Sequence, residues 1–242
     1  MFIKTKAIVL QTIKFSETSV ISKLFTQDLG LISFVVNGVR SAKAKNKSAL
    51  FQPMTILQID FNFQQNKNLQ YFKEYKRDII YEAIPFDMAK TAVGLFLIEV
   101  LSKIIREQET NHELFDLVYD SFSALDKVEK LNPDFHLQFL MQLTKLLGFE
   151  PHTPDSEQTK YFNLREGRFQ LFKGFDSSIL DEKMSSILLE MTETSLFAAI
   201  PTKLTKAERK EMLYAILNYF QYHIENFPVI KSLEVLETVF GG

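Results

Sequence analysis

The alternation of apolar and polar residues divides the chain into a β-rich first third and a helical remainder. Residues 2–15, FIKTKAIVLQTIKF, alternate with the period of two that is typical of a half-buried strand. On this pattern one face carries Ile3, Ala7, Val9, Ile13 and Phe15, and the other carries Lys4, Lys6 and Lys14.

Four further strands are predicted in the first 80 residues, over 19–26, 31–37, 54–63 and 68–75. The segments QDLG and QQNK join two pairs of them and are typical of turns. Five strands with one long insert between the third and the fourth suit a small closed barrel of the OB type. Strand periodicity alone does not separate this barrel from another small β-barrel.

After residue 85 the period becomes that of helices. Four helices are predicted, over 86–107, 111–128, 132–148 and 205–227. Asp87 or Thr91 could cap the first, Asn132 is expected to cap the third, and Thr205 with Glu208 forms a capping-box pattern before the fourth. Residues 161–172 break the helical period and predict a short hairpin that turns at Glu166–Gly167.

We therefore predict an α+β protein with two domains. Residues 1–80 form a five-stranded OB-fold barrel, and residues 81–242 form an α-helical domain with a small β-hairpin insertion at about 150–175.

The amino-acid composition excludes several kinds of site and of protein. Apolar residues make up 46% of the 242 residues and charged residues 24%, as in an ordinary globular protein. The absence of cysteine excludes disulfides and thiolate ligands. The longest apolar stretch, AVGLFLIEVLSKII, is too short for a membrane span and contains Glu99 and Lys103. We expect a soluble intracellular protein that does not bind the membrane.

No pattern of an active site is present. The eight glycines form neither a dinucleotide nor a phosphate loop, and the four histidines lie on separate segments without ligand spacing. We expect no enzyme, no catalytic residue, no metal ligand and no cofactor.

Charge is distributed unevenly along the chain. Residues 1–80 have twelve basic and five acidic side chains, whereas residues 81–242 have 16 basic and 25 acidic ones. The stretch NGVRSAKAKNK, residues 37–47, is the densest cationic segment and contains no acid. A cationic surface of this kind favours phosphate binding.

We predict a DNA-binding groove on the barrel. Tyr71, Phe72 and Tyr75 are candidates for base stacking. The predicted DNA-contacting cations are Arg40, Lys43, Lys45 and Lys47 in the insert, Lys4, Lys6 and Lys14 on the first strand, and Lys73, Lys76 and Arg77 at the end of the fifth strand.

Several segments resemble the RecO family of bacterial recombination mediators. They are KTKAIVL at the start, ETS before the second strand, LFTQDLGL, NGVRSAKAK, LFQPMTIL, FLMQLTKLLGFEP and the C-terminal LNYFQYHIENFPVIKSLEVL. The N-terminal segments are specific, and the helical ones match more loosely.

This resemblance implies an OB fold followed by a helical domain, binding of single- and double-stranded DNA, and annealing of complementary strands. It implies RecR and the C-terminal tail of the single-stranded-DNA-binding protein as partners, with RecA loaded indirectly, in the bacterial cytoplasm at the nucleoid. By position, Arg40, Lys43 and Lys45 match the family's DNA-contacting cations; Lys47 is added on charge alone.

The sequence departs from the family at two places. Many relatives carry a four-cysteine zinc module where residues 150–175 contain no cysteine. At the position of the family's basic tail-binding residue this chain has Gln138. Lys103, Arg106 and Lys145 are the substitutes that we consider for a tail-binding site.

Two other functions stay open at this point. A helical protein-interaction adaptor would use the barrel only for docking and would not bind DNA directly. A nuclease would need a cluster of carboxylates around a metal ion, which the sequence does not show.

Overall fold

The structure is a computed structural model that describes residues 1–39, 45–106 and 109–241. By the contacts between its residues the chain groups into two compact units. The barrel unit comprises Met1–Glu129 and Ile230–Leu236, and the helical unit comprises Lys130–Val229 and Glu237–Gly242. The predicted domain boundary between residues 80 and 81 stays a prediction.

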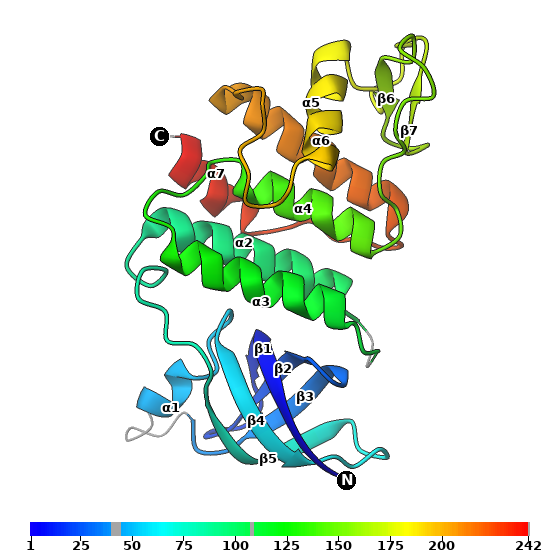
Figure 1. Cartoon of the computed structure of the whole chain (residues 1–242). Helices are drawn as coiled ribbons and strands as arrows, with labels where there is room; N and C mark the ends of the chain where they lie inside the picture. Colours follow the sequence, from blue (N-terminus) through cyan, green and yellow to red (C-terminus); the bar gives the residue numbers. More distant parts are fainter. Residues whose placement is uncertain (40–44, 107–108, 242) are drawn as a thin grey trace. The chain divides into compact units, whose positions relative to one another are not determined.

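Five strands close into a barrel in the order β1-β2-β3-β5-β4, with β4 paired to β1 (Figure 1). All neighbouring pairs are antiparallel except β3 with β5, which run parallel. This confirms the predicted OB-type barrel. The strands are β1 (Phe2–Lys14), β2 (Val20–Thr26), β3 (Gly30–Val36), β4 (Ile56–Asn62) and β5 (Leu69–Arg77), and the short α1 (Lys45–Ala49) lies between β3 and β4.

Phenylalanine rings fill much of the barrel interior. The ring of Phe34 stacks on Phe72 at a centroid distance of 4.1 Å and meets Phe61 edge-on at 4.9 Å. Phe51 belongs to the same cluster and is almost fully buried. Since the chain has no tryptophan, these rings supply the bulk that a small barrel needs.

A β-bulge in β1 overturns part of the predicted alternation. Val9 pairs with Leu24 and Gln11 with Lys23, so Leu10 is an extra residue on β1. An extra residue exchanges the inward and outward positions that follow it. The predictions that Ile13 and Phe15 share the core face, and that Lys14 shares a face with the other lysines of β1, are therefore wrong.

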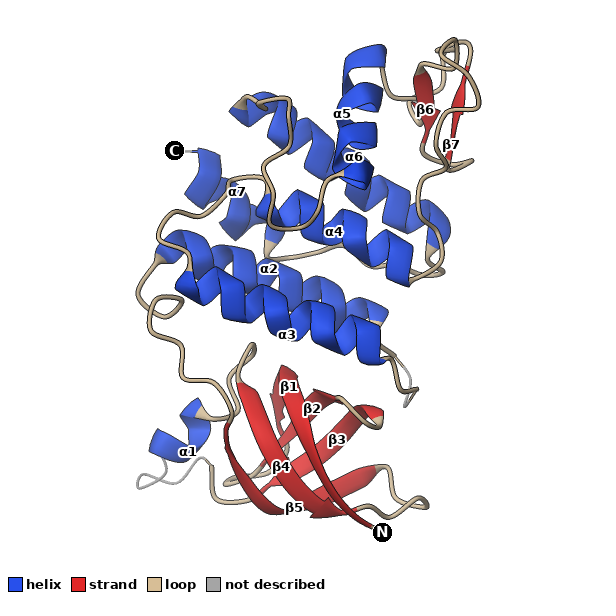
Figure 2. Cartoon of the chain, in the orientation of Figure 1, coloured by secondary structure: helices blue, strands red, loops and turns tan. Residues whose placement is uncertain are grey.

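Two long helices complete the barrel unit, α2 (Met88–Ile104) and α3 (His112–Lys127) (Figure 2). Asp87 caps α2 by accepting hydrogen bonds from the amides of Ala89 and Lys90. Phe115 of α3 lies 5.6 Å from Phe25 of β2, so helix and barrel share apolar contacts.

The helical unit contains three helices and a two-stranded sheet. Its members are α4 (Phe135–Leu146), α5 (Glu182–Glu193), α6 (Lys206–His223), β6 (Tyr161–Asn163) and β7 (Arg168–Gln170); α7 (Leu233–Gly241) contributes residues to both units. The capping box of Thr205 and Glu208 and the hairpin are confirmed.

The start of α4 differs from the prediction. Its N-cap is Asp134 rather than Asn132, and the Asp134 side chain caps no amide. Instead, the Asp134 carboxylate accepts a hydrogen bond of 2.6 Å from Nε of Arg209 on α6. Asn132 still accepts a hydrogen bond of 3.0 Å with its side chain, from the amide of Asp134.

Among the described residues, no helix has both the length and the apolar character that a membrane crossing needs.

Candidate nucleic-acid interface

The cationic insert lies only partly within the described residues. Arg40 and Lys43 fall outside them, and Lys45 begins α1. Gly38, just after β3, has a φ of +71°, a conformation that glycine adopts at little cost and that turns the chain sharply away from the strand. The Nζ atom of Lys47 donates a hydrogen bond of 2.5 Å to the carbonyl of Asn37, so this lysine ties the two ends of the insert together.

Lys6 is held by the helix next to the barrel. Its ammonium donates to the Tyr119 hydroxyl at 3.0 Å and lies 3.2 Å from the carboxylate of Asp78. The Tyr119 hydroxyl in turn donates to Asp78 at 2.9 Å. The hydrogen bond to Tyr119, together with Asp78, raises the pKa of Lys6. A phosphate would therefore have to compete with an existing partner at Lys6.

The other cations near Lys6 lie on a face of mixed charge. Along β1, β4 and β5, Lys6 pairs with Gln58 and Gln58 with Lys76. In the adjacent row, Lys4 pairs with Asp60 and Asp60 with Glu74. The carboxylates beside Lys4 weaken the attraction of this part of the surface for DNA. Arg77 pairs with Leu57 at the strand end and is exposed.

A different part of the barrel surface combines aromatic, apolar and basic groups without a carboxylate. Ile13, Ile21, Val35 and Tyr71 form one row of paired residues across β1, β2, β3 and β5. Lys23 and Ser33 pair in the next row. Lys73 is the extra residue at an irregularity of β5; it lines the same hollow as Tyr71, and its ammonium lies 5.0 Å from the centre of the Phe2 ring. We call these outward residues of β1, β2, β3 and β5 the β2–β3 face.

The β2–β3 face is accessible. Tyr71 is 56% exposed and Ile13 is 44% exposed, while Lys23 and Lys73 are exposed as well. Beside Tyr71 and Lys73, a hollow of about 300 Å³ opens at the β4–β5 hairpin, with Asn62, Gln64 and Gln70 on its walls. A ring next to an ammonium and amide groups suits a nucleotide.

The prediction from the sequence named Tyr71 and Lys73 as binding residues. It did not include Lys23, and it placed Ile13 in the core instead of on this outward face. The alternation of residues 19–26 could have indicated Lys23, because it places Lys23 opposite the buried Leu24. The orientation of Ile13 depends on the bulge, for which the sequence gives no signal.

The three candidates for a tail-binding site fall in two different units. Lys103 and Arg106 belong to the barrel unit, where Nε of Arg106 donates to the carbonyl of Lys103. Lys145 belongs to the helical unit. Gln138 is fully buried, and its amide donates to the carbonyl of Ala198 at 2.6 Å, so this residue has a structural role.

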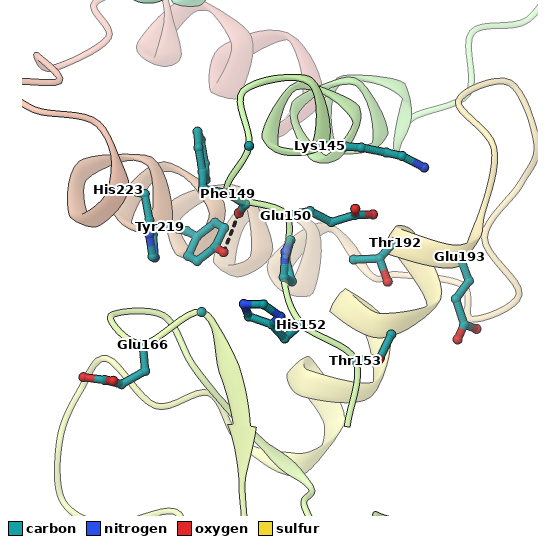
Figure 3. Close-up of a pocket in the computed structure, with 13 residues that line it drawn as sticks. Lys145, Phe149, Glu150, His152, Thr153, Glu166, Thr192, Glu193, Tyr219 and His223 are labelled. Atoms are coloured by element: carbon teal, nitrogen blue, oxygen red, sulfur yellow. Dashed lines mark hydrogen bonds between the residues drawn. The ribbon is translucent and has the colours of Figure 1, made fainter. Parts of the chain in front are cut away.

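Lys145 lines a pocket of about 660 Å³ in the helical unit (Figure 3). The Tyr219 hydroxyl donates to the carbonyl of Phe149 at 2.6 Å, and the ring of His223 stacks on that of Phe149. The pocket is also lined by three carboxylates, those of Glu150, Glu166 and Glu193. With three carboxylates and one ammonium, this pocket favours a cationic group over an acidic peptide.

The histidines and carboxylates of the described residues form no group of three or more that could hold a metal ion. Burial lowers the pKa of His136 to about 3, so its imidazole is neutral in the core.

Comparison with known proteins identifies the family. The family model "Recombination protein O N terminal" matches residues 1–77, and "Recombination protein O C terminal" matches residues 85–233. Proteins named DNA repair protein RecO from Christiangramia forsetii and Flavobacterium psychrophilum are each 36% identical over 242 residues, the whole of both chains. The one from Bacteroides fragilis is 34% identical over 241 residues, which cover 99% of this chain and 100% of the relative. The chain belongs to the RecO family of DNA repair proteins.

Proposed function

We propose that this protein is a recombination mediator that binds single- and double-stranded DNA through its barrel and anneals complementary strands. With RecR it helps load RecA onto single strands coated by the single-stranded-DNA-binding protein, whose C-terminal tail it also binds. This activity is not a bond-making reaction and takes place at the chromosome in the bacterial cytoplasm.

The β2–β3 face carries this proposal. OB folds bind oligonucleotides on strands 2 and 3 and at the adjoining loops. In this barrel the same strands present Lys23, and Tyr71 and Lys73 lie beside the β4–β5 hairpin. A ring for stacking and ammonium groups for phosphates support binding with little sequence preference.

The insert extends this face in the proposal. Arg40, Lys43 and Lys45 match the family's DNA-contacting positions, and Gly38 and Lys47 anchor the start of the insert beside the end of β3. Since these cations contact backbone phosphates, binding is expected to weaken strongly with salt.

The test compares two variants of the face with a matched control. Lys23→Glu and Tyr71→Ala are each expected to weaken binding of a labelled single-stranded oligonucleotide about tenfold, measured by fluorescence anisotropy. Lys127→Glu makes the same charge reversal at the exposed end of α3 and is expected to change affinity less than twofold.

Annealing of bare and protein-coated complementary oligonucleotides should fall in parallel with binding. If the wild-type protein does not bind DNA at low salt, the direct DNA-binding function is wrong and the adaptor function is favoured. Equal losses of affinity in Lys23→Glu and Lys127→Glu would show that DNA does not bind specifically to the β2–β3 face.

A further inference from the structure

The loop after β7 exposes two phenylalanines to solvent. Phe172 is 78% exposed, Phe175 is fully exposed, and Leu171 beside them is 48% exposed. By contrast, the rings of Phe162 and Phe169 in the same hairpin pack against each other at 5.1 Å. The inward rings of the hairpin are therefore packed, and that of Phe162 also lies 5.7 Å from the ring of Tyr219 on α6. We call residues 171–175, which follow β7, the β7 loop.

The hairpin is also basic, in a unit that is otherwise acidic. Residues 160–175 contain four cations, Lys160, Arg165, Arg168 and Lys173, and one acid, Glu166. The other residues of 130–229 contain seven basic and twelve acidic side chains. The positive charge of the helical unit is thus concentrated next to the exposed rings.

The carboxylate partners of two of these cations are exposed and can be replaced by phosphate. Arg168 lies 3.5 Å from Glu166, and both side chains are more than half exposed. Lys160 donates to Glu182 at 2.8 Å, again between exposed groups. Exposed pairs of this kind contribute little to stability, so a phosphate can replace the carboxylate at small cost.

We propose that the β7 loop is a second binding site for single-stranded nucleic acid, on which Phe172 and Phe175 stack bases while Lys173 and Arg168 contact phosphates. The charge of the hairpin favours a polyanion, and two exposed rings with a lysine between them suit unpaired bases better than a duplex. Annealing requires two DNA strands, and the β7 loop could hold the second strand while the barrel holds the first. The inference rests on the proposed function only in that the ligand is the same.

The location is tested by photochemical cross-linking of the full-length protein to a single-stranded oligothymidylate that contains 5-bromodeoxyuridine. Trypsin releases residues 169–173, with Phe172, and residues 174–183, with Phe175, as separate peptides. We expect cross-linked nucleotide on at least one of them. Absence of both adducts, when barrel peptides are cross-linked, would overturn the proposal.

A second test measures the affinity of variants for the labelled oligonucleotide. The double variant Phe172→Ala, Phe175→Ala is expected to bind the labelled oligonucleotide at least about fivefold more weakly. Phe86→Ala serves as the control because Phe86 is 86% exposed in the barrel unit and should leave affinity unchanged. Melting temperatures of all variants should match the wild type, since the removed rings are not packed.

The outcomes separate the two proposals. If the wild-type protein binds no DNA, both fail. If it binds DNA and loses affinity in Lys23→Glu but not in the double phenylalanine variant, the barrel function stands and the β7 loop site is wrong. The β7 loop site is equally wrong if the double variant changes affinity no more than Phe86→Ala.

Discussion

At the scale of single residues, two polar side chains at positions considered for ligand binding have partners within the fold. Lys6 shares its strand face with Lys4, yet its ammonium is engaged by Tyr119 and Asp78, which are 113 and 72 residues further along the chain. Gln138 likewise packs against a loop 60 residues away. Such partners cannot be predicted from local sequence, because they depend on how distant elements meet.

Asp126 of α3 should be the carboxylate whose charge matters to folding. It accepts hydrogen bonds from the amides of Glu82, Ala83 and Ile84. Burial alone would raise the pKa of Asp126, but these hydrogen bonds outweigh it and lower the pKa below its ordinary value. Asp126→Asn places an NH₂ donor against amide donors and is expected to reduce the free energy of unfolding by about 2 kcal/mol.

The pH dependence follows from the sign of that shift. A lowered folded-state pKa means that Asp126 stabilises the protein above the unfolded-state pKa of about 4 and that this contribution is lost as the pH falls through the folded value. Urea denaturation at pH 7 and pH 3 measures it. Asp120→Asn, at an exposed site on the same helix, is the control, and equal midpoints for both variants would contradict the prediction.

At the scale of elements, the strands and helices that could be predicted from the sequence are those in which the apolar pattern repeats several times. The five strands and the long helices α2, α3 and α6 each present several periods of the apolar pattern, and caps such as Asp87 mark their ends. The helix α5 has as many residues as α4, but no proline or glycine marks its ends as Pro133 and Gly148 do for α4, and it was missed together with the short α7. The bulge at Leu10 escaped because one extra residue leaves no compositional mark.

The β2–β3 turn gives a prediction at this scale. Gly30 has a φ of +65°, and an added Cβ atom would collide with the backbone of Glu109. Gly30→Ala should therefore reduce the free energy of unfolding by about 3 kcal/mol or more, from backbone strain plus the collision.

Gly38→Ala is the matched control for Gly30→Ala. Gly38 has a similar φ of +71°, but among the described residues, apart from its two chain neighbours, no atom lies within 4 Å of its added Cβ. It should lose only the strain of about 1–2 kcal/mol. Equal losses in chemical denaturation would show that the approach of Glu109 to the turn is not needed for stability.

At the scale of the whole molecule, the asymmetry of charge along the chain was the most useful signal for function. It drew attention to the first third and to the insert, and the family match supports a role in DNA repair. It did not reveal which face of the barrel is free of carboxylates. That depends on strand register, which pairs Lys4 with Asp60 but Ile21 with Val35.

The insert makes a prediction for the behaviour of the whole protein in salt. Replacing Arg40, Lys43 and Lys45 together by alanine should lower the slope of log affinity against log salt concentration for a single strand by up to ~0.7 per lost phosphate contact. We expect folding to be nearly unaffected, with a change in the free energy of unfolding of no more than about 0.5 kcal/mol for each replacement, as is usual for surface substitutions. A triple variant with unchanged slope and affinity would assign the insert no contact with phosphate.

The bulge at Leu10 has a consequence for comparing relatives. A homologue with as many residues in β1 but a regular strand in place of the bulge would turn Ile13 into its barrel and present Lys14 on the opposite face, even with identical amino acids there. A homologue that lacks one residue at positions 9–11 would instead keep these orientations, because the residues that follow keep their partners on β2. Position-by-position transfer of site residues along β1 is therefore valid only between family members whose inward and outward positions agree after residue 11.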